Sequence, residues 1–589
     1  MERSDIQTQY QWDLTDIFPS DEAWEAAFDE ICRMPDFGAY RGRLGNAESV
    51  LAYLRMQDAY EIALMRVYLY AFLRNAQNQS VTKYISYLGR VTTLFTKLSS
   101  ETAFALPELT TLPDELLIEF SKNPALSDYD TMFLRLLKEK KHVLSEKEER
   151  ILALADEPLQ TASDAFNMLN NVELNLPEMD YEGKKVQLTH GIYGVVLHGK
   201  DRSKREEVFH LYYGAYRKIV NTLAVTYAGN VKRNIFLKEV RGFDSCLQMA
   251  LFGEEVERSV YDNLIASVHS ALPVLHRYIE VRKNTLGYEK MHMYDMHVSL
   301  VEDADLALPY EEAFDLVEKG LAPLGKDYVA LLHKGRTERW LDVYETEGKT
   351  SGAYSIGVYG NHPYVLLNYT QTLTDIFTIA HEMGHALHSY FSNQTQPYAK
   401  SQYKIFVAEV ASTVNEMLLL RYLLNETTDK KIRKYLLNYF MDMIRMTLFR
   451  QTQFAEFEAE AHAMAEKGDP LNKDNLSELY YGLNKKYYGD HVVHDRDIEI
   501  EWARIPHFYN AFYVYKYATG ITAAIAISDK IIKEGQPAVD RYFEFLRRGC
   551  SMDPVTLLKD AGADLTKKET FDAAVRQFSE ALAEFESLA

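Results

Sequence analysis

The stretch LTDIFTIAHEMGHALHSYF, residues 373–391, decides how the central part of this chain folds. Its apolar residues recur at spacings of three and four, which predicts one long amphipathic helix. Thr374 or Asp375 would cap the start of that helix, because short polar side chains accept hydrogen bonds from its first free backbone N–H groups. The polar residues of the stretch therefore take fixed positions around one helix axis.

An HExxH pattern lies within this helix. His381 and His385 are four residues apart, so they project from the same face, one turn apart, and can reach one metal ion. Glu382 lies one step round from His381, where its carboxylate can touch a metal-bound water without being a ligand. The pattern arises by chance roughly 0.04 times in a chain of this length, so the metal site needs support from elsewhere in the sequence.

A third ligand must come from outside the pattern, because a hydrolytic zinc site has three protein ligands and one open position. A metzincin would continue to a third histidine, but His388 and Phe391 occupy its glycine and histidine positions, which excludes that class. One aminopeptidase pattern places a glutamate 19 residues after the second histidine, where this chain has Lys404. The next predicted helix, KIFVAEVASTVNEMLLLRYLL, offers Glu409, 24 residues after the second histidine.

The rest of the chain predicts a mainly α-helical protein with a small β-sheet. Glycine and proline are sparse among the 589 residues, and long segments carry apolar residues at helical spacing. Two segments are typical of strands: 185–197 (KVQLTHGIYGVVL) and 364–369 (YVLLNY). The glycine-rich segment 351–363 (SGAYSIGVYGNHP) predicts a flexible loop before the second strand. The length of the whole chain predicts several domains or one large body with lobes.

Composition excludes several classes of protein. The net charge of −21, from 65 Lys and Arg against 86 Asp and Glu, would repel nucleic acid and anionic membranes. The first residues carry no apolar run typical of a signal peptide, and no later run is long enough to span a bilayer, so we expect a cytoplasmic protein. The three cysteines are far apart, which indicates neither a disulfide framework nor a thiolate metal site.

At this point the chain resembles the M3 family of metallopeptidases, and within it the oligoendopeptidase F branch. In that family HExGHxxH is followed by a helix carrying E-x-x-S-x-x-x-E, matched here by HEMGHALH at 381–388 and EVASTVNE at 409–416. The thimet-type branch usually has E-x-P-S-Q in the second helix, where this chain has Glu409-Val-Ala-Ser-Thr, which favours the bacterial branch. Further matching pieces run from near the first residue to near the last: WDLTDIF at 12–18, GAYSIGVYGNHPYVLLNY at 352–369, ARIPHFYNAFYVYKYATG at 503–520 and DPVTLLKDAGADL at 553–565.

The resemblance implies a two-lobed helical body with a deep central channel and a small sheet beside the metal-binding helix. It implies an N-terminal helical domain over residues 1–195 and a catalytic domain over residues 196–589. It also implies that the strand around Val365 pairs with an extended substrate, that the preceding glycine-rich loop moves, and that only short unfolded peptides gain access.

The predicted mechanism uses one Zn²⁺ per chain, held by His381, His385 and Glu409. Zinc would polarise the scissile carbonyl and lower the pKa of bound water, and Glu382 would accept that water's proton and pass it to the leaving amine. The other predicted residues act on the oxyanion, on the orientation of the histidines or on the substrate. His507, Tyr515 and Tyr513 would stabilise the oxyanion. Glu416, Asp375 and His388 would orient the histidines. The residues that would contact the substrate are Gly352, Ala353, Tyr354, Val365, Leu366 and Tyr509.

The sequence leaves alternatives open. Asp375 could instead cap its helix, and Glu416 could be a partly exposed helix carboxylate. A peptide carrier with a structural metal would normally have four protein ligands and no need for Glu382, and a hydrolase of another amide or ester is a further possibility. The preferred side chains at the cut, the oligomeric state, and the choice among Zn²⁺, Mn²⁺ and Co²⁺ are not determined by the sequence.

Overall fold

The computed structural model describes residues 2–301 and 308–588. The chain is mainly helical with a few short strands, which confirms the predicted fold class. It forms two compact units, each assembled from three separate segments. The first unit comprises Met1–Val143, Leu306–Leu423 and Ile527–Ala563, and the second comprises Leu144–Asp305, Leu424–Ala526 and Asp564–Ala589.

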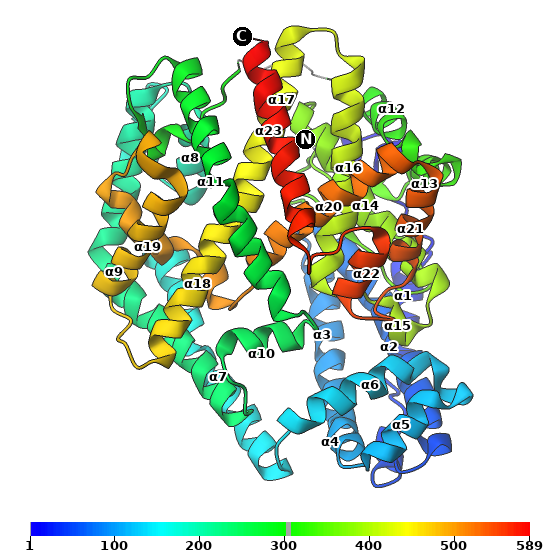
Figure 1. The fold of residues 1–589 in the computed structure, drawn as a ribbon. Helices are drawn as coiled ribbons and strands as arrows, with labels where there is room; N and C mark the ends of the chain where they lie inside the picture. The colour runs from blue at the N-terminus through cyan, green and yellow to red at the C-terminus, as the bar shows by residue number, and fades with distance from the viewer. Residues whose placement is uncertain (1, 302–307, 589) are drawn as a thin grey trace. The chain divides into compact units, whose positions relative to one another are not determined.

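The first unit contains the metal-binding motifs and most of the N-terminal helices (Figure 1). Side chains cap the starts of some of its helices; for example, the side chain of Asn46 accepts a hydrogen bond from the backbone N of Ser49 at the start of α2. Its helices are α1 Asp21–Ile31, α2 Ala47–Gln77, α3 Thr82–Thr102, α4 Ala105–Thr110, α5 Asp114–Lys122, α6 Asp130–Glu139, α12 Tyr310–Gly320, α13 Lys326–Thr337, α14 Leu373–Thr395, α15 Tyr398–Ser401, most of α16 Ile405–Glu426, α21 Gln536–Arg547 and α22 Pro554–Ala561.

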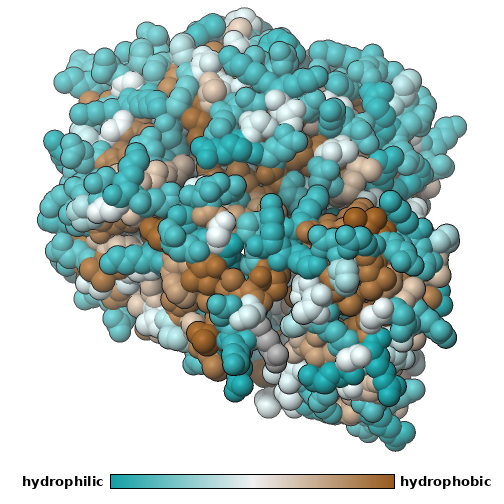
Figure 2. All heavy atoms as spheres, turned by 60° about the horizontal axis from the view of Figure 1, so that its bottom comes forward, coloured by the Kyte–Doolittle hydropathy of each residue, from teal (hydrophilic) through white to brown (hydrophobic). Residues whose placement is uncertain are grey.

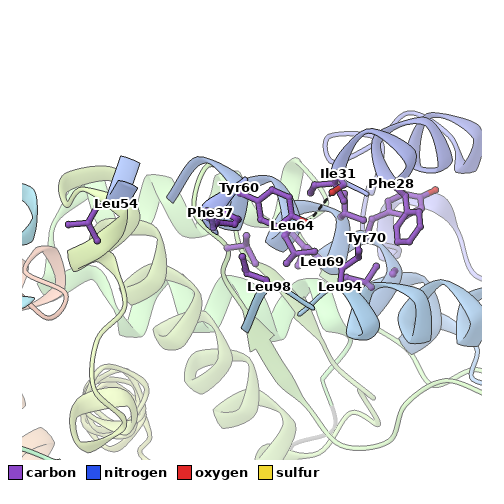
Figure 3. Close-up of a cluster of buried hydrophobic side chains, with 14 of the residues drawn as sticks. Phe28, Ile31, Phe37, Leu54, Tyr60, Leu64, Leu69, Tyr70, Leu94 and Leu98 are labelled. Atoms are coloured by element: carbon purple, nitrogen blue, oxygen red, sulfur yellow. Dashed lines mark hydrogen bonds between the residues drawn. The ribbon is translucent and has the colours of Figure 1, made fainter. Parts of the chain in front are cut away.

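A hydrophobic core joins α1, α2 and α3 of this unit (Figure 3). Phe28, Leu64 and Leu94, one from each helix, belong to it, and the hydroxyl of Tyr60 donates a hydrogen bond to the carbonyl oxygen of Ile31. Burying each such side chain contributes about 1.5–3 kcal/mol. The core continues to strand residues of the sheet described next, so these helices support the sheet.

A three-stranded sheet in the first unit has the order β4–β6–β5, with β4 at Leu341–Asp342, β5 at Tyr354–Ile356 and β6 at Tyr364–Leu366. β6 pairs in parallel with β4 and antiparallel with β5. The strand predicted at 364–369 is confirmed, although its assigned part is shorter. The prediction of a loop throughout 351–363 was wrong, because residues 354–356 pair with β6 in register.

The N-terminal segment runs beside β4. The backbone N of Val343, directly after β4, donates to the carbonyl oxygen of Tyr10 at 3.0 Å, and the backbone N of Asp13 donates to that of Arg339 at 2.9 Å. The guanidinium of Arg3 also pairs with the carboxylate of Asp342. This segment therefore covers the side of β4 that does not face β6.

The second unit is built around long helices. A hairpin of β1 (Glu178–Tyr181) and β2 (Lys184–Gln187) and a short parallel pair of β3 (Met291–His292) and β7 (Val492–Val493) accompany them. Its helices are α7 Glu146–Met168, α8 His190–His198, α9 Arg202–Val240, α10 Cys246–Gly253, α11 Arg258–Leu286, α17 Lys430–Ile444, α18 Arg450–Glu466, α19 Lys473–Tyr488, most of α20 Tyr515–Glu534 and α23 Lys568–Ser587.

The prediction of a strand over 185–197 was only partly right. Residues 184–187 are strand β2, but residues 190–198 form helix α8. The hydroxyl oxygen of Thr189 accepts a hydrogen bond from the backbone N of Ile192 and so caps this helix. The buried residues Tyr193, Val196 and Leu197 are spaced by three and four, and this pattern outweighed the strand propensity of the valines.

The surface reflects the acidic, polar composition. Figure 2 shows one face on which hydrophilic side chains predominate and hydrophobic ones gather in smaller patches. Within residues 2–301 and 308–588, no helix combines the length and apolar character needed to cross a membrane.

Candidate metal centre

Helix α14 carries the HExxH pattern and begins with a capping box. The hydroxyl oxygen of Thr372 accepts from the backbone N of Asp375, and the Asp375 carboxylate accepts from the backbone N of Thr372 in return. The cap is therefore Thr372, two residues before the earlier of the predicted candidates. The predicted helix itself is confirmed and continues to Thr395.

Helices α14 and α16 approach each other unusually closely at Gly384, in the middle of the pattern. A Cβ atom at this position would lie 2.5 Å from Cα of Ser412 and 2.8 Å from the carbonyl oxygen of Ala411. Real Cβ atoms do not approach backbone this closely, so only glycine fits here. Asn415 fixes the same contact, because its side-chain nitrogen donates to the carbonyl oxygen of Ala380 at 2.9 Å.

The close approach brings Glu409 of α16 to the two histidines of α14. Nε2 of His381 and Nε2 of His385 are 3.2 Å apart, and Oε2 of Glu409 is 3.5 Å from each of them. Within the described residues these three form the one group of His, Cys, Asp or Glu side chains able to share a metal ion.

The shape and chemistry of this triangle fit a metal. Tetrahedral zinc has bonds of about 2.0–2.1 Å to nitrogen and oxygen, which places its ligand atoms about 3.3–3.4 Å apart. The measured separations of 3.2, 3.5 and 3.5 Å match that spacing. The donors are two imidazole nitrogens and one carboxylate oxygen, which leaves a fourth position of a tetrahedron without a protein ligand.

Glu416 is a hydrogen-bond partner of the first histidine. Its carboxylate oxygen Oε1 lies 2.6 Å from Nδ1 of His381. When His381 is neutral, donation from Nδ1 to Glu416 leaves the lone pair on Nε2, toward the other ligand atoms. This contact fits the orienting role predicted for Glu416, which stays a prediction.

The charges around His381 favour a cation at this place. Burial by itself would lower the pKa of His381, but the carboxylates of Glu409 and Glu416 outweigh it and raise that pKa to about 10. Hydrogen bonds from His381 and His385 hold the pKa of Glu409 well below its ordinary value. In the metal-free chain a proton therefore occupies part of the site, and a bound metal would replace it.

Glu382 is buried beside the ligands, with 7% of its surface exposed. Burial is the largest influence on its carboxyl, and the pKa is raised from its ordinary value although both histidines act to lower it. A raised pKa brings a carboxylate closer to the value that suits a general base near neutral pH. Glu382 is not one of the three candidate ligands, so its carboxylate is available for another role.

The other two residues predicted to orient the histidines have different surroundings. Asp375 accepts hydrogen bonds from Thr370 and Thr372, so its carboxylate belongs to the helix cap and not to a histidine. The buried ring of His388 stacks on Tyr403 at 3.8 Å, and its Nδ1 has no hydrogen-bond partner. Burial lowers the pKa of His388 to about 3, so this ring is a neutral packing group.

The predicted substrate residues divide between a central strand and an edge strand. Val365 and Leu366 are fully buried in β6, which is paired on both sides, so the prediction that this strand pairs with substrate was wrong. In the described part of the chain β5 has a strand partner on one side only. Tyr354 lies in β5, and Gly352 and Ala353 directly precede it, so these three lie along the edge strand.

The aromatic residues predicted for oxyanion stabilisation lie in the second unit, whereas the three candidate ligands belong to the first. The rings of His507 and Tyr513 stack with centroids 6.0 Å apart, and the hydroxyl of Tyr517 lies 3.4 Å from Nε2 of His507. Tyr515 does not join them: it is 1% exposed and its ring packs edge-on against Tyr261.

Tyr509 also has partners within the protein. Its hydroxyl lies 2.7 Å from that of Thr226, and its ring stacks on Phe166 at 4.2 Å. These contacts support a structural role, in contrast to the predicted contact with substrate. Of the phenols, Tyr513 and Tyr517 are the ones beside His507.

The prediction missed the residues that hold the two helices together. Gly384 and Ser412 stood within the matched motifs, where a glycine facing a small residue can indicate close helix packing. Asn415, which lies among mostly apolar residues in the middle of α16, was a second signal, because a buried amide needs partners. Its Oδ1 accepts a hydrogen bond from Tyr328 of α13, so it links three helices.

Comparisons with known proteins identify the family of the chain. The model of peptidase family M3 matches residues 195–577, and that of oligopeptidase F matches residues 108–175. Oligopeptidase PepF of Bacillus subtilis is 43% identical over 591 residues, covering 100% of this chain and 88% of the relative. Group B oligopeptidase PepB of Streptococcus agalactiae is 38% identical over 590 residues, covering 100% and 98%.

A solved structure adds support for the fold. The crystal structure of oligoendopeptidase-F from Enterococcus faecium aligns with a TM-score of 0.75 at 35% identity, covering 96% of this chain and 98% of that one. Because the family model matches well over half of the chain and these relatives match nearly all of it, the chain belongs to peptidase family M3, in its oligopeptidase F branch, and is a metallo-endopeptidase.

Proposed function

We propose that this chain is a zinc-dependent endopeptidase that hydrolyses internal bonds of short oligopeptides, with Glu382 as the general base. The observation that carries the proposal is the triangle of His381, His385 and Glu409, whose ligand atoms are 3.2–3.5 Å apart with the Glu382 carboxylate beside them. Two imidazoles and a carboxylate are a donor set typical of catalytic zinc.

When bound, the metal supplies a Lewis acid that polarises the scissile carbonyl and lowers the pKa of water. The chain's own residues do the rest. His381, His385 and Glu409 would hold the metal, while Glu416 keeps the lone pair of His381 directed at it. The Glu382 carboxylate accepts a proton from the attacking water and delivers it to the leaving amine nitrogen.

The substrate assignment rests on the relatives and on the edge strand. Both curated relatives are named oligopeptidases, which favours short peptides as substrates of this chain. We assign backbone recognition to β5, since an edge strand can pair with any extended peptide. His507 and Tyr513 are proposed to donate hydrogen bonds to the oxyanion, on the family resemblance of segment 503–520.

A purely structural metal is less consistent with this site. Structural zinc is usually enclosed by four protein ligands, whereas the group here has three. It also has no use for a buried carboxylate such as Glu382, because burial disfavours the charged form of that group. Catalysis gives that carboxylate a role.

The test is Glu382→Gln, assayed for metal content and for cleavage of a quenched peptide. We expect one metal per chain in both proteins and a loss of several orders of magnitude in kcat for the variant. Retention of full activity would reject Glu382 as the base. Loss of metal together with activity would show that Glu382 is needed for the ligand set instead.

The size limit has a separate test. We expect a short peptide to be cut far faster than casein, as the names of the relatives suggest. Comparable rates on both substrates would contradict the assignment to oligopeptides.

A further inference from the structure

A cavity of about 340 Å³ lies in the first unit between the sheet and the first turns of α14. No step of the proposed reaction uses it. Its wall has contributions from the segment before β5, from the residues that follow β6, and from α14. The lining residues are Gly352, Ala353, Leu367, Asn368, Tyr369, Asp375 and Thr378.

The cavity lies beside the part of α14 that precedes the candidate ligands, and Thr378 shares a helix face with His381. Thr378 and Asp375 precede His381 by three and six residues, which corresponds to about 5 and 9 Å along the helix axis. An extended peptide advances about 3.3 Å per residue. A peptide beside β5 would therefore place in this cavity a group two or three residues from the bond that is cut.

One hydrogen-bond acceptor in the wall is fixed and has no donor. The side-chain nitrogen of Asn368 donates to the carbonyl oxygens of Thr350 at 3.0 Å and Gly352 at 2.7 Å, which settles the orientation of the amide. Its Oδ1 is buried and has no hydrogen-bond partner. Burying an acceptor without a donor is unfavourable, so a ligand that supplies a donor would be favoured.

The second acceptor carries charge. All the hydrogen bonds that the described residues make to the Asp375 carboxylate, from Thr370 and Thr372, go to Oδ2. Oδ1 is left for a ligand. The lining contains no lysine or arginine to neutralise this carboxylate. Its charge and the free amide oxygen together select a group with several N–H donors and a positive charge.

The size of the cavity limits what can enter. Ligand pockets usually measure about 300–1,000 Å³, and this one is at the lower end, enough for one side chain. Ala353 and Leu367 give it apolar wall that the methylene groups of a long cationic side chain could contact.

We propose that this cavity is a specificity pocket for a cationic group of the peptide substrate, bound by Asn368 Oδ1 and Asp375 Oδ1. The inference rests on the proposed peptidase function. The group is an ammonium or guanidinium, supplied by a lysine or arginine side chain or by the N-terminus of the peptide.

The first experiment compares substrates on the parent enzyme. Arginine is placed in turn at each position up to three residues from the cut, and each peptide is paired with its citrulline analogue, which has the same shape without the charge. Each is made with a free and an acetylated N-terminus. We expect kcat/KM to be about tenfold or more higher for arginine at one position, or for the free N-terminus. Ratios near one in every pair would overturn the proposal.

The second experiment fills the pocket from within. Thr378→Arg places a guanidinium in the lining, and Thr374→Arg adds the same charge to the same helix at an exposed position outside it. We expect the preference for the cationic peptide to fall to about one in Thr378→Arg and to persist in Thr374→Arg. Equal ratios in the two variants would contradict the assignment, and circular dichroism and metal content verify that both are folded.

A binding measurement separates this proposal from the proposed function. Calorimetric titration of Glu382→Gln with the arginine and citrulline peptides reports the pocket without hydrolysis. Tighter binding of the arginine peptide supports the pocket even if the parent cleaves neither peptide, an outcome that would overturn the function alone. Equal affinities would overturn the pocket while leaving the function intact.

Discussion

At the scale of single residues, the metal site depends on the absence of a side chain at position 384. The backbone of Ser412 occupies the volume where a Cβ would be, so α16 can lie against α14 only if residue 384 is glycine. The position of Glu409 follows from that contact, because it lies on α16 one turn before Ser412, whose hydroxyl donates to the carbonyl oxygen of Glu409. The five residues of the HExxH pattern, 381–385, thus supply both the glycine needed for helix packing and two of the candidate metal ligands.

Gly384→Ala should therefore weaken metal binding as well as stability. The added methyl group must push two backbones apart, at a cost on the order of 1–3 kcal/mol, and would displace Glu409 from the histidines. Thermal unfolding and chelator competition measure the two effects. Gly89→Ala is the matched control, since Gly89 lies within α3 with nothing within 4 Å of a new Cβ. That change should stabilise the chain by about 0.5–1 kcal/mol.

The Glu416 carboxylate allows a second prediction at this scale. Glu416→Ala removes the acceptor 2.6 Å from Nδ1 of His381 and should weaken metal binding about 10- to 100-fold. Glu416→Gln keeps an acceptor oxygen without the charge and should have an intermediate effect. Glu426→Ala, at the exposed end of the same helix, is the control and should leave the metal affinity unchanged. An unchanged affinity in Glu416→Ala would exclude an orienting role.

At the scale of elements, a buried carboxyl on α18 holds the segment that carries the aromatic residues. Oε1 of Glu458 accepts a hydrogen bond from the backbone N of Phe512 at 2.9 Å. Phe512 has a φ of 57°, a left-handed conformation that is strained for a residue with a bulky side chain. Because the backbone of Phe512 is held in place, the backbone position of the neighbouring Tyr513 is fixed as well.

Glu458 gives the second unit a pH-dependent stability. Burial raises the pKa of this carboxyl from 4.5 to about 8, so folding takes up a proton between these values. The contribution is fully present below pH 4.5 and is lost as the pH rises through 8, a decrease on the order of a few kcal/mol. Urea unfolding at pH 5 and pH 8 should show a smaller decrease in Glu458→Gln than in the parent. Identical decreases would show that this carboxyl does not titrate with folding.

The elements also show what could be predicted from the sequence. The helix of residues 373–391 was predictable because a long apolar pattern and a metal motif coincide there. The strand–helix boundary near Thr189 was not predictable. Valines favour strands, whereas the burial of Tyr193, Val196 and Leu197 on one face favours a helix. The edge position of β5 depends on pairing between distant segments, which local patterns do not encode.

For the candidate site, too, local motifs were predictable from the sequence and tertiary contacts were not. The three ligands are side chains at fixed spacings on two helices, and their convergence could be anticipated from the motifs. Which tyrosine faces away from the core could not, since Tyr513 lies in the irregular segment before α20 and Tyr515 is the first residue of that helix. Burial of Tyr515 against Tyr261 is a tertiary contact between positions far apart in the sequence.

At the scale of the whole molecule, the two compact units do not correspond to consecutive halves of the sequence. Each compact unit draws on the N-terminal, central and C-terminal parts of the chain. The predicted division into residues 1–195 and 196–589 follows the sequence and stays a prediction, as do the two-lobed shape and the channel. The two helices of the metal site are neighbours in the sequence, but the compact unit that contains them is completed by segments more than a hundred residues away on either side.

The N-terminal segment beside β4 makes the sheet sensitive to how a shortened protein is designed. Deleting residues 2–13 would remove the backbone partners of Arg339 and Val343 and leave the outer edge of β4 bare. We expect this truncation to melt at a lower temperature and to elute as oligomers in size-exclusion chromatography. Deleting only residues 2–7 keeps the contacts of Tyr10 and Asp13 and should leave the chain monodisperse relative to the full-length protein. Residues 2–13, although far in sequence from Glu382, would thus protect this strand edge from pairing with other copies of the chain, so an expression plasmid that omits them is expected to yield aggregated protein.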